Sequence, residues 1–570
     1  MRNAQLKPAH CFWIFLVMLI LPNVFMLFTE STGLLTRVVN LILPLGLYWM
    51  AMTLSSKPGK MFWCLFLFIF FNAFETVLLY LFGESPIAVD MFLNLVTSNA
   101  TEADELLAQI YPSVIFVVVF YGFGIVLSIV ALRKRLRLHE SFRHNQRVLG
   151  ALVTAVGLVL LVVNYFVDAR FRMRNDIFPV NVCYNLGLSV QRFVQSERYP
   201  TTSAHFSHLA TTERPDSIPE VYVLIIGETL RADNMSLYGY ERNTTPQLKA
   251  LADTTQSLAV FADVITMSNT THKSVPLLLT ATASQGDYDS LYTQRGAISA
   301  FREVGFDTYY ISNQRRNHSF IDYLGCEAEH VSFLKDSLPL SANLYDDALL
   351  DELRRVLPAQ GEGAVDGSVL IVLHCYGSHF DYRDRYPKAY ARFAPTDYPS
   401  ATRTQRQQLV NAYDNTIAYA DHIVAGVISA LDRQGIPAVM MFTSDHGEDI
   451  FDDSRNRFLH ASPQPTYYQL RVPLLIWASQ LWRDRYPDKW QVVMSHRRQP
   501  VSTGMVTFHT LLDLAGVHSH VLRKQHALGS PQFTPMHRRY VNDHNELVSI
   551  DSCGLKRLDF EQFHAHGLKL

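Results

Sequence analysis

The sequence is poor in charge and in cysteine. Charged residues make up 18% of the 570 residues, and 50 Lys and Arg against 52 Asp and Glu leave a net charge of −2. The lack of a basic excess argues against a protein that binds nucleic acid through phosphate contacts. The six cysteines include no Cys-x-x-Cys pair, which argues against a zinc ribbon or a disulfide-stapled mini-domain.

Apolar residues are abundant, and they are unevenly placed. They make up 48% of the chain, which excludes intrinsic disorder, and the length favours at least two domains. Before residue 168 they form five runs, each near the ~20 residues that a membrane-spanning helix needs. The runs are Cys11–Phe28, Leu34–Leu54, Met61–Phe82, Ser113–Leu132 and Val148–Val167. We therefore predict a transmembrane domain of five helices over residues 1–167.

The first run could also be a signal peptide. It lacks a small-residue cleavage site, and another apolar run follows at once, so we expect it to be retained.

The basic residues between the runs predict the orientation of the chain in a membrane. The segment after the fourth run holds six Arg and Lys within 133–147 and a single acid, Glu140. The segment 83–111, on the other side of that run, holds five acids and no Lys or Arg. Together with Arg2 and Lys7, this alternation predicts a cytoplasmic N-terminus and places everything after Val167 outside.

The remaining chain is predicted to hold a connector, residues 168–219, and an α/β domain, residues 220–570. Short apolar runs alternate there with helical segments, which favours strands buried on both faces and hence a parallel sheet. The candidate strands are Val221–Ile226, Thr308–Ser312, Val369–His374, Ala438–Thr443 and Pro473–Ala478.

Polar residues stand where several of these candidate strands end. Glu228 follows the first, His374 ends the third, and Asp445 and His446 follow the fourth. Ligands of parallel sheets bind beyond these carboxyl ends, and a mixed carboxylate and imidazole set suits zinc or manganese better than calcium. Each residue alone has a plainer interpretation as a solvated loop or turn residue. Their coincidence at separate strand ends indicates a metal site.

The Thr-rich segment 267–280 supplies a candidate nucleophile. Ser268 or Asn269 could cap a helix that continues into apolar residues, which would put Thr270 or Thr271 at the helix N-terminus. Free N–H groups and the helix dipole favour negative charge at that end, including that of an alkoxide. The alternative interpretation is an ordinary Thr-rich cap.

Several motifs occur in the order found in the membrane phosphoethanolamine transferases, which include enzymes that modify lipid A. The segments 226–233 (Ile-Gly-Glu-Thr-Leu-Arg-Ala-Asp) and 444–448 (Ser-Asp-His-Gly-Glu) resemble the two metal motifs of that family. The resemblance implies an alkaline-phosphatase or sulfatase-like outer domain and zinc held by Glu228, Asp445 and His446. One tightly bound ion is expected, and a second ion during turnover is left open.

The same resemblance assigns the reacting and substrate-binding residues. The family nucleophile is a threonine four residues before a Val-Pro pair, which selects Thr271 over Thr270 and makes its oxygen the fourth metal ligand. Three histidines match the substrate-site histidines of the family: His374, His379 and His460.

The acidic segment between the third and fourth runs also matches a family pattern, associated with binding of lipid headgroups. The matching residues are Asn94, Ser98 and Glu102. Taken without the resemblance, the segment would be an amphipathic helix at the membrane interface.

Two departures from the family concern cysteine and lysine. Met267 stands where lipid A-modifying members often have a cysteine, so a disulfide network is not expected, and a phosphate-binding lysine has no clear counterpart except His318 or Arg316. Both departures favour a branch that modifies the lipopolysaccharide core.

The resemblance implies transfer of phosphoethanolamine from phosphatidylethanolamine to a lipopolysaccharide acceptor, either a core sugar or lipid A, through a covalent intermediate on Thr271. It further implies a multi-pass protein of the bacterial inner membrane with a periplasmic catalytic domain, and we expect a monomer. The alternatives are a glycerophosphate transferase of the lipoteichoic-acid-synthase type and a catalytically inactive membrane receptor or scaffold. Sulfatase activity is not expected, because the nucleophile segment lacks the Cys/Ser-x-Pro-x-Arg pattern.

Overall fold

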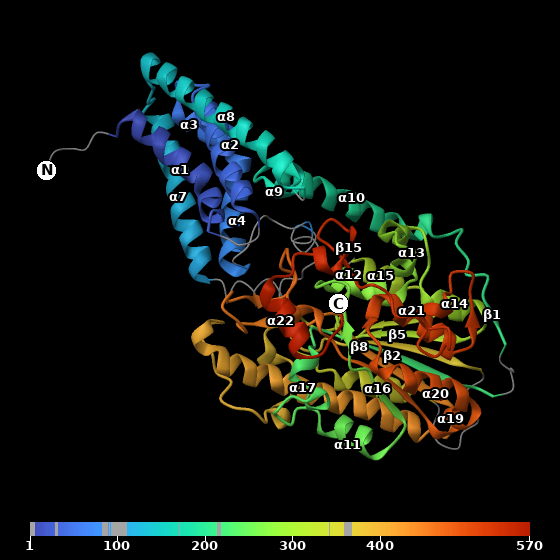
Figure 1. Ribbon diagram of the computed structural model, residues 1–570. Helices are drawn as coiled ribbons and strands as arrows, with labels where there is room; N and C mark the ends of the chain where they lie inside the picture. The colour runs from blue at the N-terminus through green and yellow to red at the C-terminus, as the bar shows by residue number, and fades with distance from the viewer. Residues whose placement is uncertain are drawn as a thin grey trace. The chain divides into compact units, whose positions relative to one another are not determined.

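The computed structural model describes residues 6–28, 32–82, 89, 92, 111–169, 171–213, 218–317, 319–340, 342–357 and 367–570. They form two compact units (Figure 1). The helical unit holds the described residues up to 92 together with 111–191 and 455–457, and the sheet unit holds 192–454 and 458–570. The boundary falls inside a long helix, α10 (Val180–Thr202), which lies within the predicted connector, residues 168–219, where the sequence analysis predicted no helix.

Four helices of the helical unit are long and apolar enough to cross a membrane. They are α1 (Pro8–Met26), α2 (Leu34–Met52), α7 (Tyr111–Arg133) and α8 (Glu140–Val167). The third predicted run is not one straight helix. It is divided into α3 (Pro58–Cys64) and α4 (Phe66–Phe82), bent by 68°, and Leu65 between them leaves helical geometry at φ −102° and ψ 11°. The described chain thus offers four spans, or five if the bent pair crosses as one.

Glycines allow α2 and α8 to lie unusually close together. A Cβ atom built on Gly46 would lie 2.5 Å from the Thr154 backbone nitrogen, and one on Gly157 would lie 2.7 Å from Leu43 Cα. Small residues that let helix backbones approach are typical of helix packing in membranes.

Buried amides add directional contacts to the helical unit. Asn23 Nδ2 on α1 donates to the Asn40 carbonyl on α2 (2.7 Å) and to the Phe178 carbonyl (3.1 Å). The Phe178 N–H donates in turn to Asn40 Oδ1 (2.9 Å). These bonds tie two helices to the segment after α8.

The sheet unit is built on a seven-stranded sheet in the order β3-β11-β8-β2-β7-β5-β6. The strands are β2 (Val221–Gly227), β3 (Leu258–Val260), β5 (Asp307–Ser312), β6 (His330–Phe333), β7 (Val369–His374), β8 (Ala438–Ser444) and β11 (Leu474–Ala478). Every residue of β2, β7 and β8 is buried, as the continuous apolar runs predicted. Five strands, β8-β2-β7-β5-β6, are parallel.

The prediction that Pro473–Ala478 belongs to the parallel set is wrong. β11 pairs antiparallel with both β8 and β3. A parallel return requires a crossover to the opposite edge of the sheet. The segment 445–473 makes no such crossover, because it carries Asp445, His446 and His460, which lie at the carboxyl edge, and β11 therefore runs back from that edge.

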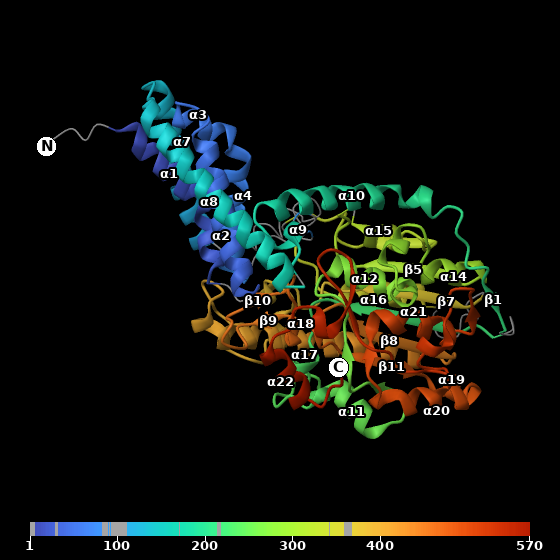
Figure 2. The same ribbon diagram turned by 45° about the horizontal axis from the view of Figure 1, so that its top comes forward.

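Helices cover both faces of the sheet (Figures 1 and 2). One layer contains α12 (Thr271–Leu279), α14 (Ala297–Glu303), α15 (Phe320–Gly325) and α21 (Thr503–Leu514), and the other contains α11 (Pro246–Thr254), α16 (Asp347–Val356) and α17 (Arg406–Asp432). The principal core lies under the first layer, where Tyr222, Leu224 and Ile226 of β2 pack against α12 and α21. This two-layered cover explains why the central strands are apolar throughout.

Short strands and helices complete the sheet unit. The strand pairs are β1 (Thr211–Thr212) with β13 (Val517–His518), β4 (Val264–Ile265) with β12 (Val501–Ser502), β9 (Asp449–Ile450) with β10 (Phe458–Leu459), and β14 (Arg539–Val541) with β15 (Leu547–Ser549). The helices are α13 (Thr282–Gln285), α18 (Tyr467–Leu470), α19 (Gln480–Arg485), α20 (Pro487–Ser495) and α22 (Arg557–Ala565), and α9 (Met173–Asp176) belongs to the helical unit.

Candidate active site

The register of the central strands brings the predicted site residues to one edge. Gly227 at the end of β2 pairs with Ser444 at the end of β8, and Ile226 pairs with His374 at the end of β7. Glu228 and Asp445 each come one residue later. Residues far apart in the sequence therefore meet where three neighbouring strands end.

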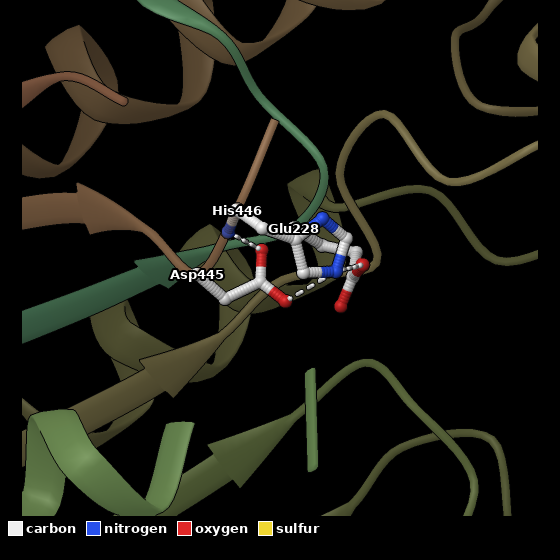
Figure 3. A group of neighbouring side chains, drawn as sticks. All are labelled: Glu228, Asp445 and His446. Carbon is white, nitrogen blue, oxygen red and sulfur yellow. Dashed lines mark hydrogen bonds and ion pairs between the residues drawn. The ribbon is translucent and has the colours of Figure 1, made fainter. Parts of the chain in front are cut away.

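Glu228, Asp445 and His446 form a compact group of potential metal ligands (Figure 3). One ligand atom from each lies within 4.8 Å of the others, and all three side chains are at most 1% exposed. His446 Nε2 is 3.2 Å from Asp445 Oδ2 and 3.7 Å from Glu228 Oε1. Burial, followed by the negative charge of Asp445, raises the pKa of Glu228 well above its usual value. Two buried carboxylates this close together call for a cation.

Two further observations fit a metal ion at this point. Asp445 Oδ2 is buried and has no hydrogen-bond donor among the residues that the structure describes. His446 Nδ1 lies 2.9 Å from the Gly447 carbonyl oxygen, which can only accept, so Nδ1 carries the proton and Nε2 turns a lone pair toward the carboxylates. Burial lowers the pKa of His446 to about 4, so the imidazole is neutral, as a metal ligand must be.

The Glu228 turn is held in an unusual backbone conformation. Thr229 has φ +59°, which is rare for a β-branched residue. Its N–H donates to Asp445 Oδ1 (2.9 Å), its hydroxyl donates to Glu228 Oε1 (2.6 Å), and its carbonyl accepts from Tyr413 (2.7 Å). Such strain persists where the surroundings over-determine it, and here it aims the Glu228 carboxylate.

The Thr271 hydroxyl faces the same centre. Its Oγ1 lies 3.3 Å from each Glu228 carboxylate oxygen and 3.1 Å from His446 Nε2. Thr271 is the first residue of α12, and Thr270 is the N-cap, so the prediction that Ser268 or Asn269 caps the helix is wrong. The Asn269 side chain is instead engaged by Ser462, Gln469 and Tyr540. The Thr270 hydroxyl lies near Ser268 Oγ (3.3 Å).

The three predicted substrate-site histidines line a cavity of about 120 Å³ beside Thr271. Burial lowers the pKa of His374 and of His460 to about 4, and burial together with Arg385 lowers that of His379 well below its usual value. The ring of His460 lies 4.2 Å from that of His446, centroid to centroid, and its Nδ1 is 3.2 Å from Glu448 Oε1. The cavity therefore presents neutral imidazoles next to a threonine hydroxyl.

Gly377, in the Gly377-Ser378-His379 segment, is required for steric reasons. A Cβ on Gly377 would lie 2.6 Å from the Glu228 carbonyl oxygen, and the residue has φ +54°. Ser378 N–H donates to that same carbonyl (2.9 Å). Glycine thus lets the loop that carries His379 pack directly on the Glu228 turn.

Gln314 is a site residue that the sequence analysis missed. Its Nε2 donates to Glu228 Oε2 (3.1 Å) and lies 3.2 Å from His374 Nε2. Gln314 comes two residues after β5, so the strand-end rule that found Glu228 could have found it as well. Gln314 was not selected because the search for metal ligands considered only carboxylate and imidazole side chains.

The other sequence candidates lie apart from this cluster or outside the described residues. Arg316 stacks on Phe333 at 4.6 Å, faces Asp336 at 3.9 Å and is not part of the cavity wall. His318 and the three lipid-headgroup candidates Asn94, Ser98 and Glu102 lie outside the described residues. All six cysteines are free.

A lysine ammonium group lies next to the cavity wall. The Lys335 ammonium sits 3.3 Å from the centre of the Tyr376 ring, and Tyr376 lines the cavity. Arg315 also lines it, but its guanidinium donates to backbone carbonyls, including that of Leu338 (3.0 Å).

Comparison with known proteins identifies relatives of this chain. The family model described as "Sulfatase" matches residues 220–517. "Phosphoethanolamine transferase EptC" of Escherichia coli K12 is 28% identical over 341 residues, which covers 58% of this chain and 57% of that protein. "Kdo(2)-lipid A phosphoethanolamine 7''-transferase" of the same strain is 27% identical over 319 residues, covering 54% of this chain and 53% of that protein. The chain thus matches little more than half the length of these relatives.

Solved structures support the fold of both units. The C-terminal periplasmic domain of E. coli EptC in complex with Zn is 27% identical, with a TM-score of 0.54, and the match covers 60% of this chain and 96% of that domain. The integral membrane phosphoethanolamine transferase EptA of Neisseria meningitidis has a TM-score of 0.71 at 21% identity, and the match covers 92% of this chain and 98% of that one. At that identity the likeness concerns the fold: apolar N-terminal helices followed by an alkaline-phosphatase or sulfatase-like domain.

Proposed function

This chain belongs to the sulfatase family, and we propose that it transfers phosphoethanolamine from phosphatidylethanolamine to a lipopolysaccharide acceptor. The observation that carries the proposal is the placement of Thr271 Oγ1 at a helix N-terminus, 3.1 Å from His446 Nε2 and 3.3 Å from both Glu228 oxygens. The substrate class comes from the names of the relatives, two of which are phosphoethanolamine transferases.

The metal of this proposal is zinc, held by Glu228, Asp445 and His446 with Thr271 Oγ1 as the fourth ligand. A relative's periplasmic domain is known as a zinc complex, which supports this choice. When bound, zinc lowers the pKa of a hydroxyl and stabilises negative charge on a phosphoryl oxygen. The donor set of two carboxylates and one neutral imidazole suits it.

In the first half-reaction Thr271 Oγ1 attacks phosphorus, and the bond from phosphorus to the glycerol oxygen breaks. The proton lost by Thr271 balances the proton gained by the released diacylglycerol, and phosphoethanolamine remains esterified to Thr271. The N-terminal N–H groups of α12 favour the negative charge that develops on the threonine oxygen.

In the second half-reaction an acceptor hydroxyl attacks the same phosphorus and Thr271 recovers its proton. In this proposal His460 moves these protons through Nε2. The contact between its Nδ1 and Glu448 Oε1 supports this role, because it leaves Nε2 available to accept and return a proton. His374 and His379 bind the phosphate oxygens or hold a second ion during turnover.

Both substrates of this reaction are membrane lipids, which accounts for the apolar helices. We place the protein in the bacterial inner membrane as a monomer, with its N-terminus in the cytoplasm and its catalytic domain in the periplasm. Asn94, Ser98 and Glu102 contact the lipid headgroup. Reporters fused after Arg143 and after Glu213 should report opposite sides of the membrane, and the same side for both would contradict this orientation.

The decisive test compares Thr271→Ala with Thr270→Ala in the full-length protein. Thr270 is a matched control, because its hydroxyl makes no capping hydrogen bond to α12. Thr271→Ala should abolish diacylglycerol release and transfer, whereas Thr270→Ala should keep most of both. Wild-type protein incubated with phosphatidylethanolamine alone should carry phosphoethanolamine on the peptide containing Thr271, measured by mass spectrometry.

Three results would contradict the proposal: an adduct on Thr270, transfer retained by Thr271→Ala, or turnover of phosphatidylglycerol in preference to phosphatidylethanolamine. The last result would favour a glycerophosphate transferase. Separate mass spectrometry of lipid A and core oligosaccharide, from cells with and without the protein, identifies the acceptor.

A further inference from the structure

A buried chain of hydrogen bonds runs behind the nucleophile turn. Tyr540 Oη donates to Asn269 Oδ1 (2.7 Å), Asn269 Nδ2 donates to Gln469 Oε1 (2.7 Å), and Gln469 Nε2 donates to Asp449 Oδ2 (2.7 Å). Thr466 Oγ1 donates to the other Asp449 oxygen (2.9 Å). All five residues are at most 3% exposed. Buried chains of this kind are costly unless every member is satisfied, and these members are.

The donor and acceptor in each hydrogen bond of this series are fixed by Asp449 at its end. A carboxylate only accepts, so Gln469 must turn its NH₂ toward Asp449 and its carbonyl oxygen toward Asn269. Asn269 must then present its own NH₂ to Gln469, which leaves Oδ1 to accept from Tyr540. Asn269→Asp would place a carboxylate oxygen next to Gln469 Oε1, so that two acceptors would face each other. Gln469 could not rotate its amide to donate to the new carboxylate without breaking its hydrogen bond to Asp449.

The same residues hold the loop that carries His460. Leu459 and Ala461, on either side of His460, have φ of +67° and +61°. Such conformations are unfavourable for non-glycine residues and persist only with outside support. The support comes from three bonds: Gln469 Nε2 to the Leu459 carbonyl (3.2 Å), Ala461 N–H to the Asn269 carbonyl (3.1 Å), and Asn269 Nδ2 to the Ser462 carbonyl (2.9 Å).

Asn269 is also two residues before Thr271. We infer that Asn269 is a positioning residue that locks the Thr271 turn to the His460 loop, so that the nucleophile and the proton-transferring imidazole face the same phosphorus atom. This inference rests on the proposed function only for its kinetic consequence. Its structural half, the clamp on the strained loop, stands on the contacts alone.

The test uses Asn269→Ala in the full-length, zinc-loaded protein, with Asn411→Ala as the control. Asn411 is equally buried, at 3%, and its side chain also makes three hydrogen bonds, to Arg242, Gln407 and the Pro395 carbonyl, none of them at the site. Hydrogen exchange of the peptide over 458–463 should become faster in Asn269→Ala and stay unchanged in Asn411→Ala. Equal exchange in the two variants would overturn the clamp.

The kinetic readout separates positioning from general destabilisation. Asn269→Ala should lower kcat by about 100-fold, the effect of a misplacement of about 1 Å, with KM for phosphatidylethanolamine and zinc content unchanged. Asn269→Asp, which fills the same volume, should be at least as slow, whereas Tyr540→Phe, which removes one outer bond, should be the mildest. A kcat for Asn269→Ala equal to that of Asn411→Ala, or full recovery in Asn269→Asp, would overturn the inference. An inactive wild-type protein would instead refute the proposed function, while the exchange result would still decide the clamp.

Discussion

The helical unit and the sheet unit use buried polar groups in different ways. In the helical unit, buried asparagine side chains join neighbouring helices. Asn23 donates to the carbonyl and side-chain oxygens of Asn40, and Asn72 donates to the Leu19 carbonyl. In the sheet unit, Glu228 and Asp445 face each other across His446, with acceptor atoms converging on one point. Buried amide donors that reach acceptors on a neighbouring helix hold a fold together. Two buried carboxylates that converge, one of them with an oxygen that has no hydrogen-bond donor among the described residues, indicate the place of a cation.

The two units also use glycine differently. In α2 and α8, glycines remove side chains so that two backbones can touch along a helix pair. In the sheet unit, Gly377 lets a single loop approach the Glu228 turn. The first arrangement stabilises a long contact, and the second shapes one point.

The largest expected effect lies at the converging acceptors. Asp445→Ala should remove bound zinc and reduce transfer to background, because it deletes one of the three proposed protein ligands that converge there. Zinc content by metal analysis and transfer by mass spectrometry check this in purified full-length protein. Asp253→Ala, at an exposed aspartate that pairs with Lys249, should leave both unchanged. A metal-free Asp445→Ala protein with full activity would refute the metal site.

A second expectation concerns the helix contact in the other unit. Gly157→Leu forces a side chain against the Leu43 backbone and should destabilise the protein by about 1–3 kcal/mol, as overpacking does. Thermal unfolding in detergent measures the change. Gly122→Leu on α7 is the matched control and should be nearly neutral, since no described atom outside the adjoining backbone of α7 lies within 4 Å of the added Cβ. Equal stability of the two variants would show that close α2–α8 packing does not matter.

A buried histidine of the sheet unit, remote from the metal group, should make stability depend on pH. Burial lowers the pKa of His208 to about 4 in the fold, with Glu303 opposing and His520 adding to the shift. The folded state therefore binds fewer protons than the unfolded state, whose pKa is about 6.5. Stability is fully present above that value and falls as the pH drops toward 4, by about 2 kcal/mol between about pH 7 and pH 5.

Unfolding measured across this range should show a shallower slope in His208→Gln. An unchanged slope in His208→Gln would assign the pH dependence to other groups.

The smallest effect is expected from cysteine. Replacing Cys326, Cys375 and Cys553 together by Ser should preserve transfer, with a stability loss of about 1–2 kcal/mol from the two buried positions. Unfolding with and without a reducing agent should coincide. A loss of stability on reduction would reveal a disulfide.

The sequence predicted most of the fold wherever a local pattern was sufficient. The strands β2, β5, β7 and β8 lie within one residue of the predicted runs, because strands buried on both faces must be continuously apolar. The strand-end rule indicated Glu228, Asp445 and His446. The choice of Thr271 over Thr270 came from the family resemblance, since both residues fit a helix N-terminus.

Other features depended on residues far apart in the chain, and only the tertiary structure decided them. β11 runs antiparallel because the segment 445–473 stays at the carboxyl edge of the sheet before β11 begins. No local sequence pattern indicates that path. The N-cap at Thr270 follows because Asn269 is drawn away by Gln469 and by Tyr540, 271 positions later. A sequence specifies which residues are apolar or polar along each element. Which buried donor meets which acceptor is decided only when distant segments pack together.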